Sequence, residues 1–206
     1  GNTAAVFHGT SSEGISVPDY SQLTLGSSAT LEAWVKPSAL SGGYQPILQK
    51  WDYAIGQYEY ALGIDGATGR LVYYQGAGGS VVAGSGSLAV GQWTHVAATL
   101  SGSTVTLYVN GVMVGSGAVN PAITNTSAPF YIGNDPGSPY CCYGSVDEVA
   151  VYSSVLSVET IQSHQVRTAG ATAYASTILA GNPTGYWRLG EVAGSTTVAD
   201  SSVNGF

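Results

Sequence analysis

The chain has 206 residues, of which 44% are hydrophobic and only 8% are charged, and its formal net charge is −7. This length and apolar content are enough for one sandwich or barrel with a packed core. The acidic balance and the lack of a basic cluster argue against nucleic acid and anionic membrane as partners, and no apolar run approaches the ~18 residues of a membrane-spanning helix.

Short alternating segments, broken by Gly, Ser and Pro, run along the whole chain, which is typical of an all-β protein. The predicted strands include TLEAWVKP (30–37), QYEYALGID (57–65), STVTLYVNGVMVG (103–115), APFYIG (128–133) and GSVDEVAVY (144–152). In the second, Tyr58, Tyr60, Leu62 and Ile64 are expected on one face. Asn110-Gly111 predicts a hairpin turn, because both turn positions need a positive φ.

One helix is expected, at about 157–165. Ser157 can cap its first turn, and Glu159 suits the positive end of the helix dipole. With about ten strands, these elements predict two packed antiparallel sheets over residues 3–152, a jelly-roll sandwich.

The two cysteines, Cys141 and Cys142, are adjacent. Consecutive Cα atoms lie about 3.8 Å apart, which is shorter than the roughly 4.4–6.8 Å of an ordinary disulfide. A bridge between them is therefore a strained vicinal ring, and two free or intermolecular thiols are the alternative. No His stands at a ligand spacing from them, so a zinc site is not expected.

Several stretches together resemble the bacterial laminin-G-like domains of the concanavalin A-like jelly-roll superfamily. They are AAVFHGTSSEGISVPD (4–19), TLEAWVKP (30–37), GQWTHVAATLSGSTVTLYVNG (91–111), FYIGND (130–135) and GSVDEVAVYSSVLSVETIQSH (144–164). They follow the family order over residues 3 to about 168. The resemblance implies the fold, and it implies less about function because this fold hosts many functions.

Such domains begin with a strand that is similar to PTGYWRLGE, which here stands after the expected helix. The resemblance thus divides the chain into a unit at 1–168 without its first strand, a linker at 169–182, and an opening strand and loop at 183–206. The opening strand can fill the vacancy in its own chain, fill that of a neighbouring copy, or belong to a following repeat. We expect the neighbouring copy, with Tyr186, Trp187 and Leu189 as the assembly strand.

A missing strand and few charges to protect sheet edges favour a non-catalytic structural or adhesive unit, extracellular or at the cell surface, repeated or polymerised head-to-tail. Its partners are then neighbouring copies of itself. The alternative is a carbohydrate-binding module that contacts glycans. Trp34 and Tyr140 are its first candidates, with Tyr44, Tyr73, Tyr74 and Tyr108 next, since a sugar ring can stack on an aromatic face. Core packing is the competing interpretation of each ring.

Some relatives in the superfamily are glycoside hydrolases, whose retaining members need two carboxyl groups about 5–5.5 Å apart. Asp147 and Glu148 are consecutive in a predicted strand and are expected to face opposite ways. His8, His95 and His164 are scattered along the chain. We therefore expect no enzyme.

The resemblance also implies a structural Ca²⁺ between the first and last strands, because Ca²⁺ prefers oxygen ligands. The matching positions are Asp147 and Glu191, and Asp200 with Asn204 forms a second acidic loop. The alternative is a solvent-facing Asp and a Glu paired with Arg188.

Overall fold

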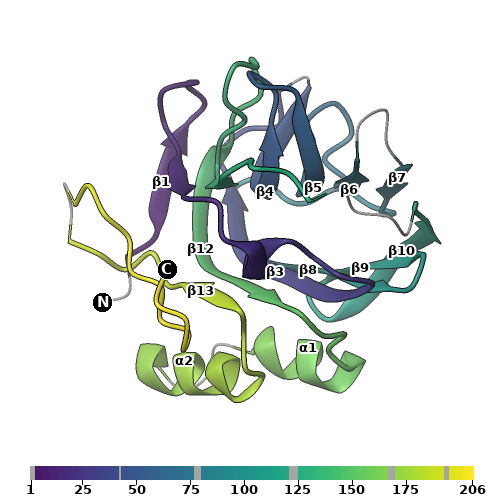
Figure 1. Ribbon diagram of the computed structural model, residues 1–206, viewed down its shortest axis with the longest axis vertical. Helices are drawn as coiled ribbons and strands as arrows, with labels where there is room; N and C mark the ends of the chain where they lie inside the picture. The colour runs from purple at the N-terminus through teal and green to yellow at the C-terminus, as the bar shows by residue number, and fades with distance from the viewer. Residues whose placement is uncertain (1–2, 42, 77–79, 121–124, 167–169, 193–194) are drawn as a thin grey trace.

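The structure is a computed structural model, and it describes residues 3–41, 43–76, 80–120, 125–166, 170–192 and 195–206. Two antiparallel sheets pack face to face, with two helices on the outer side of one of them (Figure 1). The predicted jelly-roll sandwich is confirmed.

The first sheet carries the helices on its outer face. Within the described residues it has seven strands, in the order β1-β12-β3-β8-β9-β10, with β13 also paired to β12. Their bounds are β1 (Ala5–His8), β12 (Tyr143–Tyr152), β3 (Ser28–Pro37), β8 (Thr94–Ser101), β9 (Thr104–Val109), β10 (Val112–Ala118) and β13 (Gly185–Trp187).

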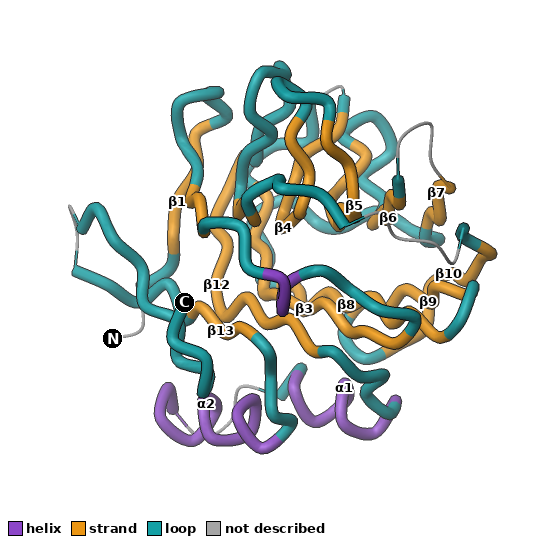
Figure 2. Tube along the Cα trace, in the orientation of Figure 1, coloured by secondary structure: helices purple, strands orange, loops and turns teal. Residues whose placement is uncertain are grey.

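The second sheet has six described strands, in the order β2-β11-β4-β5-β6-β7. Their bounds are β2 (Ile15–Val17), β11 (Phe130–Ile132), β4 (Tyr44–Asp52), β5 (Gln57–Asp65), β6 (Leu71–Gln75) and β7 (Ser80–Ala83). A short 3₁₀ turn (Ser21–Leu23) precedes β3. As Figure 2 shows, the helices lie on the far side of the other sheet, so neither of them covers this one.

Local sequence signals account for several of these elements. Asn110 and Gly111 both have a positive φ, 48° and 71°, and join β9 to β10 as the turn chemistry predicts. Helix α1 (Val158–His164) begins at Ser157, whose side chain accepts a hydrogen bond from the Thr160 backbone N–H. Both predictions are confirmed.

Tyr58 does not share the core face of β5 with Tyr60 and Leu62. The register between β4 and β5 shifts at Lys50/Trp51, which is a β-bulge, and the period of two breaks there. Tyr58 instead contacts the Trp51 ring at 4.7 Å on the other side of the sheet. The expected common face is therefore corrected.

The expected linker is corrected as well, because helix α2 (Gly170–Ala180) occupies most of it, while residue 169 lies outside the described residues. Tyr174 and Ile178 of α2 pack on Trp34 and Tyr152 of the first sheet. This packing carries the chain across the sheet's outer face to the start of β13 (Figure 1).

The tail strand β13 completes the sheet of its own chain. It runs antiparallel to β12, with Val149 opposite Trp187 and Val151 opposite Gly185. β1 pairs with the other half of β12, so the two short strands lie end to end along it. Of the three arrangements that the sequence leaves open, this single chain adopts the self-filling one.

The three apolar side chains of the expected assembly strand are buried within the chain itself. Tyr186 and Trp187 are 0% exposed and Leu189 is 3% exposed. Trp187 stacks on Phe130 of the opposite sheet at 5.0 Å between ring centroids, so it joins the central core. Its burial ties the C-terminal segment to the rest of the domain.

Beneath the helices, a buried polar cluster surrounds Glu32 of β3. The Tyr152 hydroxyl donates to its Oε1 at 2.6 Å, His164 Nδ1 lies 2.9 Å from the same oxygen, and His95 Nε2 lies 3.3 Å from Oε2. Burial by itself raises the pKa of Glu32, but the hydrogen bonds of His164 and His95 outweigh it and lower the pKa from 4.5 to about 2.

This depressed pKa predicts an acid-sensitive contribution to stability. A carboxyl group whose pKa is lower in the folded state stabilises fully above its unfolded pKa, and this stabilisation disappears as the pH falls from about 4.5 to about 2. The loss should be on the order of 3 kcal/mol. We expect Glu32→Gln to be less stable than wild type at pH 7 and nearly equal to it at pH 2.5, by urea unfolding. A difference that stays constant over that range would contradict the assignment.

Trp187→Ala should destabilise the single chain, because it opens a cavity beside Phe130. We expect a loss of about 3–5 kcal/mol in the free energy of unfolding, at any protein concentration. Trp93→Ala, at a partly buried ring outside the central core, serves as the control. A loss that is small at low protein concentration and grows as the concentration rises would instead indicate that the strand docks between copies.

Candidate functional site

An aromatic pocket lies on the outer face of the second sheet, over β4, β5 and β6. It encloses about 450 Å³, and its walls include Tyr44, Trp51, Tyr53, Tyr74 and Tyr140. This volume is within the range of small-molecule binding sites, roughly 300–1,000 Å³.

The strands place these rings by register. Tyr44 begins β4, and Tyr74 of β6 lies opposite Ala61 of β5. Ala61 is small and lies at the pocket wall, while its neighbours Tyr60 and Leu62 point into the core. Gly63 allows the Tyr44 ring to lie close to the sheet, since a Cβ there would be 2.4 Å from Tyr44 Cε2. The small residues of β5 thus leave the hollow that the rings surround.

The rings hold one another in place through edge contacts. Tyr44 meets Tyr140 at 6.2 Å and Tyr74 at 5.1 Å between centroids, and Tyr74 meets Trp51 at 6.3 Å. Edge-to-face contacts of this kind are a preferred geometry for aromatic pairs. The pocket is therefore a preformed, linked wall of rings.

Two buried polar atoms of the pocket residues lack a partner. Tyr44 Oη and Asp135 Oδ1 make no hydrogen bond with any described residue. Burial is the main cause that raises the pKa of Tyr44 well above 10 and that of Asp135 above 3.8. Buried polar atoms are normally hydrogen-bonded, so these two are unsatisfied groups beside the pocket.

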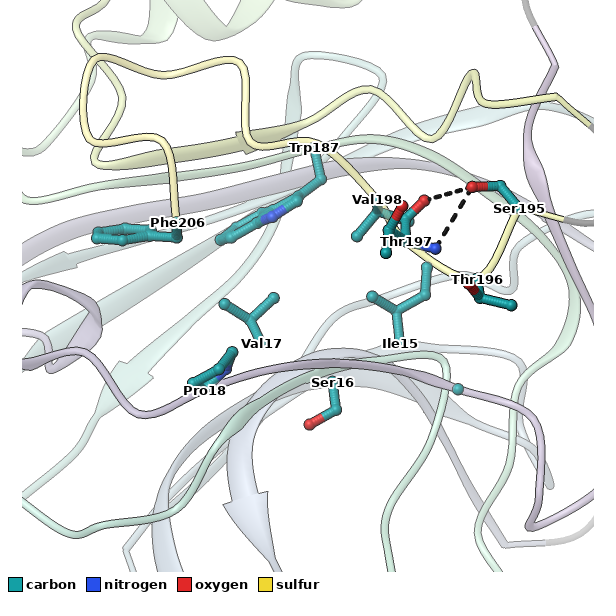
Figure 3. Close-up of a pocket in the computed structure, with 11 residues that line it drawn as sticks. Ile15, Ser16, Val17, Pro18, Trp187, Ser195, Thr196, Thr197, Val198 and Phe206 are labelled. Carbon is teal, nitrogen blue, oxygen red and sulfur yellow. Dashed lines mark hydrogen bonds between the residues drawn. The ribbon is translucent and has the colours of Figure 1, made fainter.

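A second cavity, of about 370 Å³, lies between β2 and the tail. Figure 3 shows Ile15 and Val17 on one side, facing Trp187 and Val198 on the other. Ser195 and Thr197 at its rim hydrogen-bond to each other, and the last residue, Phe206, stacks on Tyr20 at 4.5 Å. This cavity lies along the contact, here called the tail seam, between the C-terminal tail and its own domain.

The structure separates the glycan candidates of the sequence. Tyr140, Tyr44 and Tyr74 line the pocket, and Tyr140 is 39% exposed. Trp34 is only 7% exposed, and its Nε1 donates to Tyr174 Oη beneath α2. Trp34 therefore presents no free face, and this expectation is corrected.

Tyr73 and Tyr108 are buried too, in the core and under α1 respectively. No sequence pattern singled out the pocket residues Trp51, Tyr53, Asp65 and Asp135. The signal for Trp51 was hidden by the register shift between Pro46 and Leu48, where β4 carries an extra residue that breaks the alternation starting at Tyr44.

Cys141 and Cys142 are free and buried, next to Tyr140. Burial raises the pKa of both thiols, that of Cys142 to about 12. Thiols with raised pKa values are poor nucleophiles at neutral pH. Of the two alternatives, the structure shows free thiols.

The carboxylates expected at a calcium site bond to backbone N–H groups of the chain itself. Asp147 Oδ1 accepts from Glu148 N, and Glu191 Oε1 accepts from Ala199 N. Asp200 accepts from the backbone N–H groups of Tyr186, Ser202 and Phe206, and Asn204 Nδ2 donates to Thr184 O. Arg188 lies 3.8 Å from Glu148.

The described residues contain no group of three or more His, Cys, Asp or Glu side chains that could hold a metal. The donor set around Asp147 and Glu191 therefore does not by itself form a carboxylate cage, and calcium stays a prediction from the resemblance.

The chain is similar in structure to domain 4 of an extracellular arabinanase from Geobacillus stearothermophilus, solved in complex with arabinotriose. The identity is 26% and the TM-score 0.62, over 78% of this chain and 75% of that one. It is also similar to a putative carbohydrate-binding protein from Bacteroides ovatus, with 19% identity and a TM-score of 0.73, over 97% of this chain and 55% of that one. A Trypanosoma rangeli sialidase matches at 22% identity and a TM-score of 0.57, over 75% of this chain but only 26% of the sialidase.

No curated protein matches the chain. Among the described residues, no helix is both long and apolar enough to cross a membrane. A family model of the concanavalin A-like lectins and glucanases matches residues 8–162, which is well over half of the sequence. The chain therefore belongs to the concanavalin A-like lectin/glucanase superfamily.

Proposed function

We propose that the protein is a non-catalytic carbohydrate-binding module that acts outside the cell, and that the aromatic pocket of the second sheet is its binding site. The observation that carries the proposal is the linked wall of rings beside two unpartnered polar atoms. Ligand sites typically combine apolar walls with a few polar groups that fix orientation.

The chemistry of the pocket suits a sugar. The C–H face of a sugar ring can pack on Tyr74 or Tyr140, and its hydroxyls can pair with Tyr44 Oη and Asp135 Oδ1. Satisfying a buried, unpaired polar atom removes a cost of about 1–3 kcal/mol, so these two atoms favour a hydroxylated ligand over an apolar one.

The arabinanase domain, which was solved with arabinotriose and is 26% identical, supports this proposal. The structural or adhesive function that the sequence favoured has less support, since the groove that motivated it holds the chain's own β13. Self-association would need a surface other than the edge of β12. Binding to glycans does not, because the pocket is complete within one chain.

The pocket predicts which substitutions weaken binding. Tyr74→Ala removes the central ring, and Tyr140→Ala removes an outer one. An aromatic contact contributes about 0.5–1.5 kcal/mol beyond its buried area, so each should reduce affinity by about 2- to 12-fold. Isothermal titration calorimetry with arabinotriose and a panel of plant oligosaccharides measures this.

Tyr20→Ala is the matched control, because Tyr20 stacks on Phe206 away from the pocket. It should leave the affinity unchanged. The site assignment is wrong if Tyr20→Ala weakens binding as much as Tyr74→Ala does. Release of reducing sugar from a bound oligosaccharide would contradict the non-catalytic part of the proposal.

We also propose, from the family resemblance, that Ca²⁺ joins the closing and opening strands at Asp147 and Glu191. Linkage then requires the stability to rise with free Ca²⁺, by about 2.7 kcal/mol at a hundredfold excess over the dissociation constant. The melting temperature, measured after chelation and again after Ca²⁺ addition, tests this. An unchanged melting temperature would contradict the proposed Ca²⁺ site.

A further inference from the structure

We infer that the aromatic pocket selects neutral glycans and rejects acidic ones, with the Asp135 carboxylate as the acceptor for sugar hydroxyls. This inference rests on the proposed function and adds a ligand class to it. It follows from which charged groups line the pocket and which are held elsewhere.

The charged groups at the pocket are acidic. Asp65 and Asp135 line it, and Asp52 lies close enough to Asp135 to raise its pKa further. Asp65 Oδ1 accepts from the backbone N–H groups of Ala67 and Thr68, which holds that carboxylate at the rim. An incoming carboxylate would meet like charge across a desolvated contact, which suppresses binding.

The described cations do not offset this charge. Lys50 is buried against Asp19 at 2.9 Å and Glu59 at 2.6 Å, and Arg188 lies near Glu148 on the tail. Lys36 belongs to β3 of the other sheet. Arg70 ends the 65–70 turn, where its carbonyl accepts from the Asp65 N–H, but its side chain is exposed and is not part of the pocket wall.

Asp135 is the residue that can accept a hydrogen bond from a sugar hydroxyl. It is 2% exposed and lines the pocket, with its Oδ1 unpartnered. The carboxyl group of Asp135 also has hydrogen bonds with Ser138, the Tyr53 backbone and Gln49, and Oδ1 is its atom without a partner. Asp52 accepts from Tyr131 Oη at 3.1 Å and from the Ala54 N–H at 3.0 Å. A sugar hydroxyl can donate to Asp135 Oδ1, whereas a sugar carboxylate has no proton to donate there. Asp135 Oδ1 therefore favours neutral glycans and disfavours acidic ones.

Probe pairs that differ mainly in charge test the inference. We would compare lactose with sialyllactose and the methyl ester of trigalacturonic acid with the free acid, and include arabinotriose, all by calorimetry at low salt. In every pair with measurable binding, the neutral member should bind at least about tenfold more tightly, since a hydrogen bond to a charged acceptor is lost and repulsion is added.

Asp135→Asn should lower the affinity for neutral probes by about tenfold, and it should reduce the difference in affinity between neutral and acidic probes. Glu159→Gln is the charge-matched control, because it removes one negative charge from helix α1 on the other sheet. It should leave the affinities for neutral and for acidic probes unchanged. Asp65→Asn keeps the Oδ1 acceptor of the turn. It should reduce the difference in affinity between neutral and acidic probes without the tenfold loss of affinity for neutral ones. It provides the test if Asp135→Asn fails to fold by its melting curve.

The outcomes separate the two claims. Acidic probes that bind as tightly as neutral ones, and lose binding with Tyr74→Ala, would overturn the neutral-glycan inference and leave the pocket as a glycan site. Neutral probes that bind Asp135→Asn as tightly as wild type would overturn the role of Asp135. If no glycan binds, the proposed function fails, and this inference fails with it.

Discussion

The domain depends on the pairing of β13 with β12 and on the burial of Trp187 that this pairing allows. The tail strand occupies the half of β12 that β1 leaves unpaired, and its Trp ring stacks on Phe130 across the sandwich. Without it, part of one edge of β12 and part of the core would face water, at the cost of unpaired backbone groups. The strand that the sequence resemblance assigned to the start of a domain thus completes the sheet of its own chain.

The path of the chain to β13 determines which face of the sandwich is free to bind a ligand. The chain reaches β13 by way of α1 and α2, which lie against the outer face of the first sheet and bury Trp34 and the Glu32 cluster (Figure 1). That face is therefore occupied by the protein itself. The second sheet carries no described helix, and its small residues Ala61 and Gly63 lie among large rings. One face gives stability, and the other leaves room for a ligand.

Sequence patterns predicted the sandwich because alternation, Asn110-Gly111 and Ser157 are local signals with one structural outcome each. Helix α2 was not predicted, although its alanines have high helix propensity. The site was harder to predict. Trp34 and Tyr140 looked alike as isolated aromatics, and only the packing of α2 distinguishes them. Trp51 depends on a bulge, and Asp135 on a loop that follows β11, neither of which has a periodic signal.

The most direct test of the central claim, a self-completed domain that binds glycan at its aromatic pocket, is an NMR titration of the ¹⁵N-labelled chain with a neutral oligosaccharide such as arabinotriose. The account predicts amide shift changes that saturate and concentrate at Gly43, Asp65, Tyr74 and Tyr140, with those of β13 unchanged and a monomeric tumbling time throughout. Changes centred on Trp187 and Phe206 at the tail seam, or saturating changes spread away from the pocket, would contradict it.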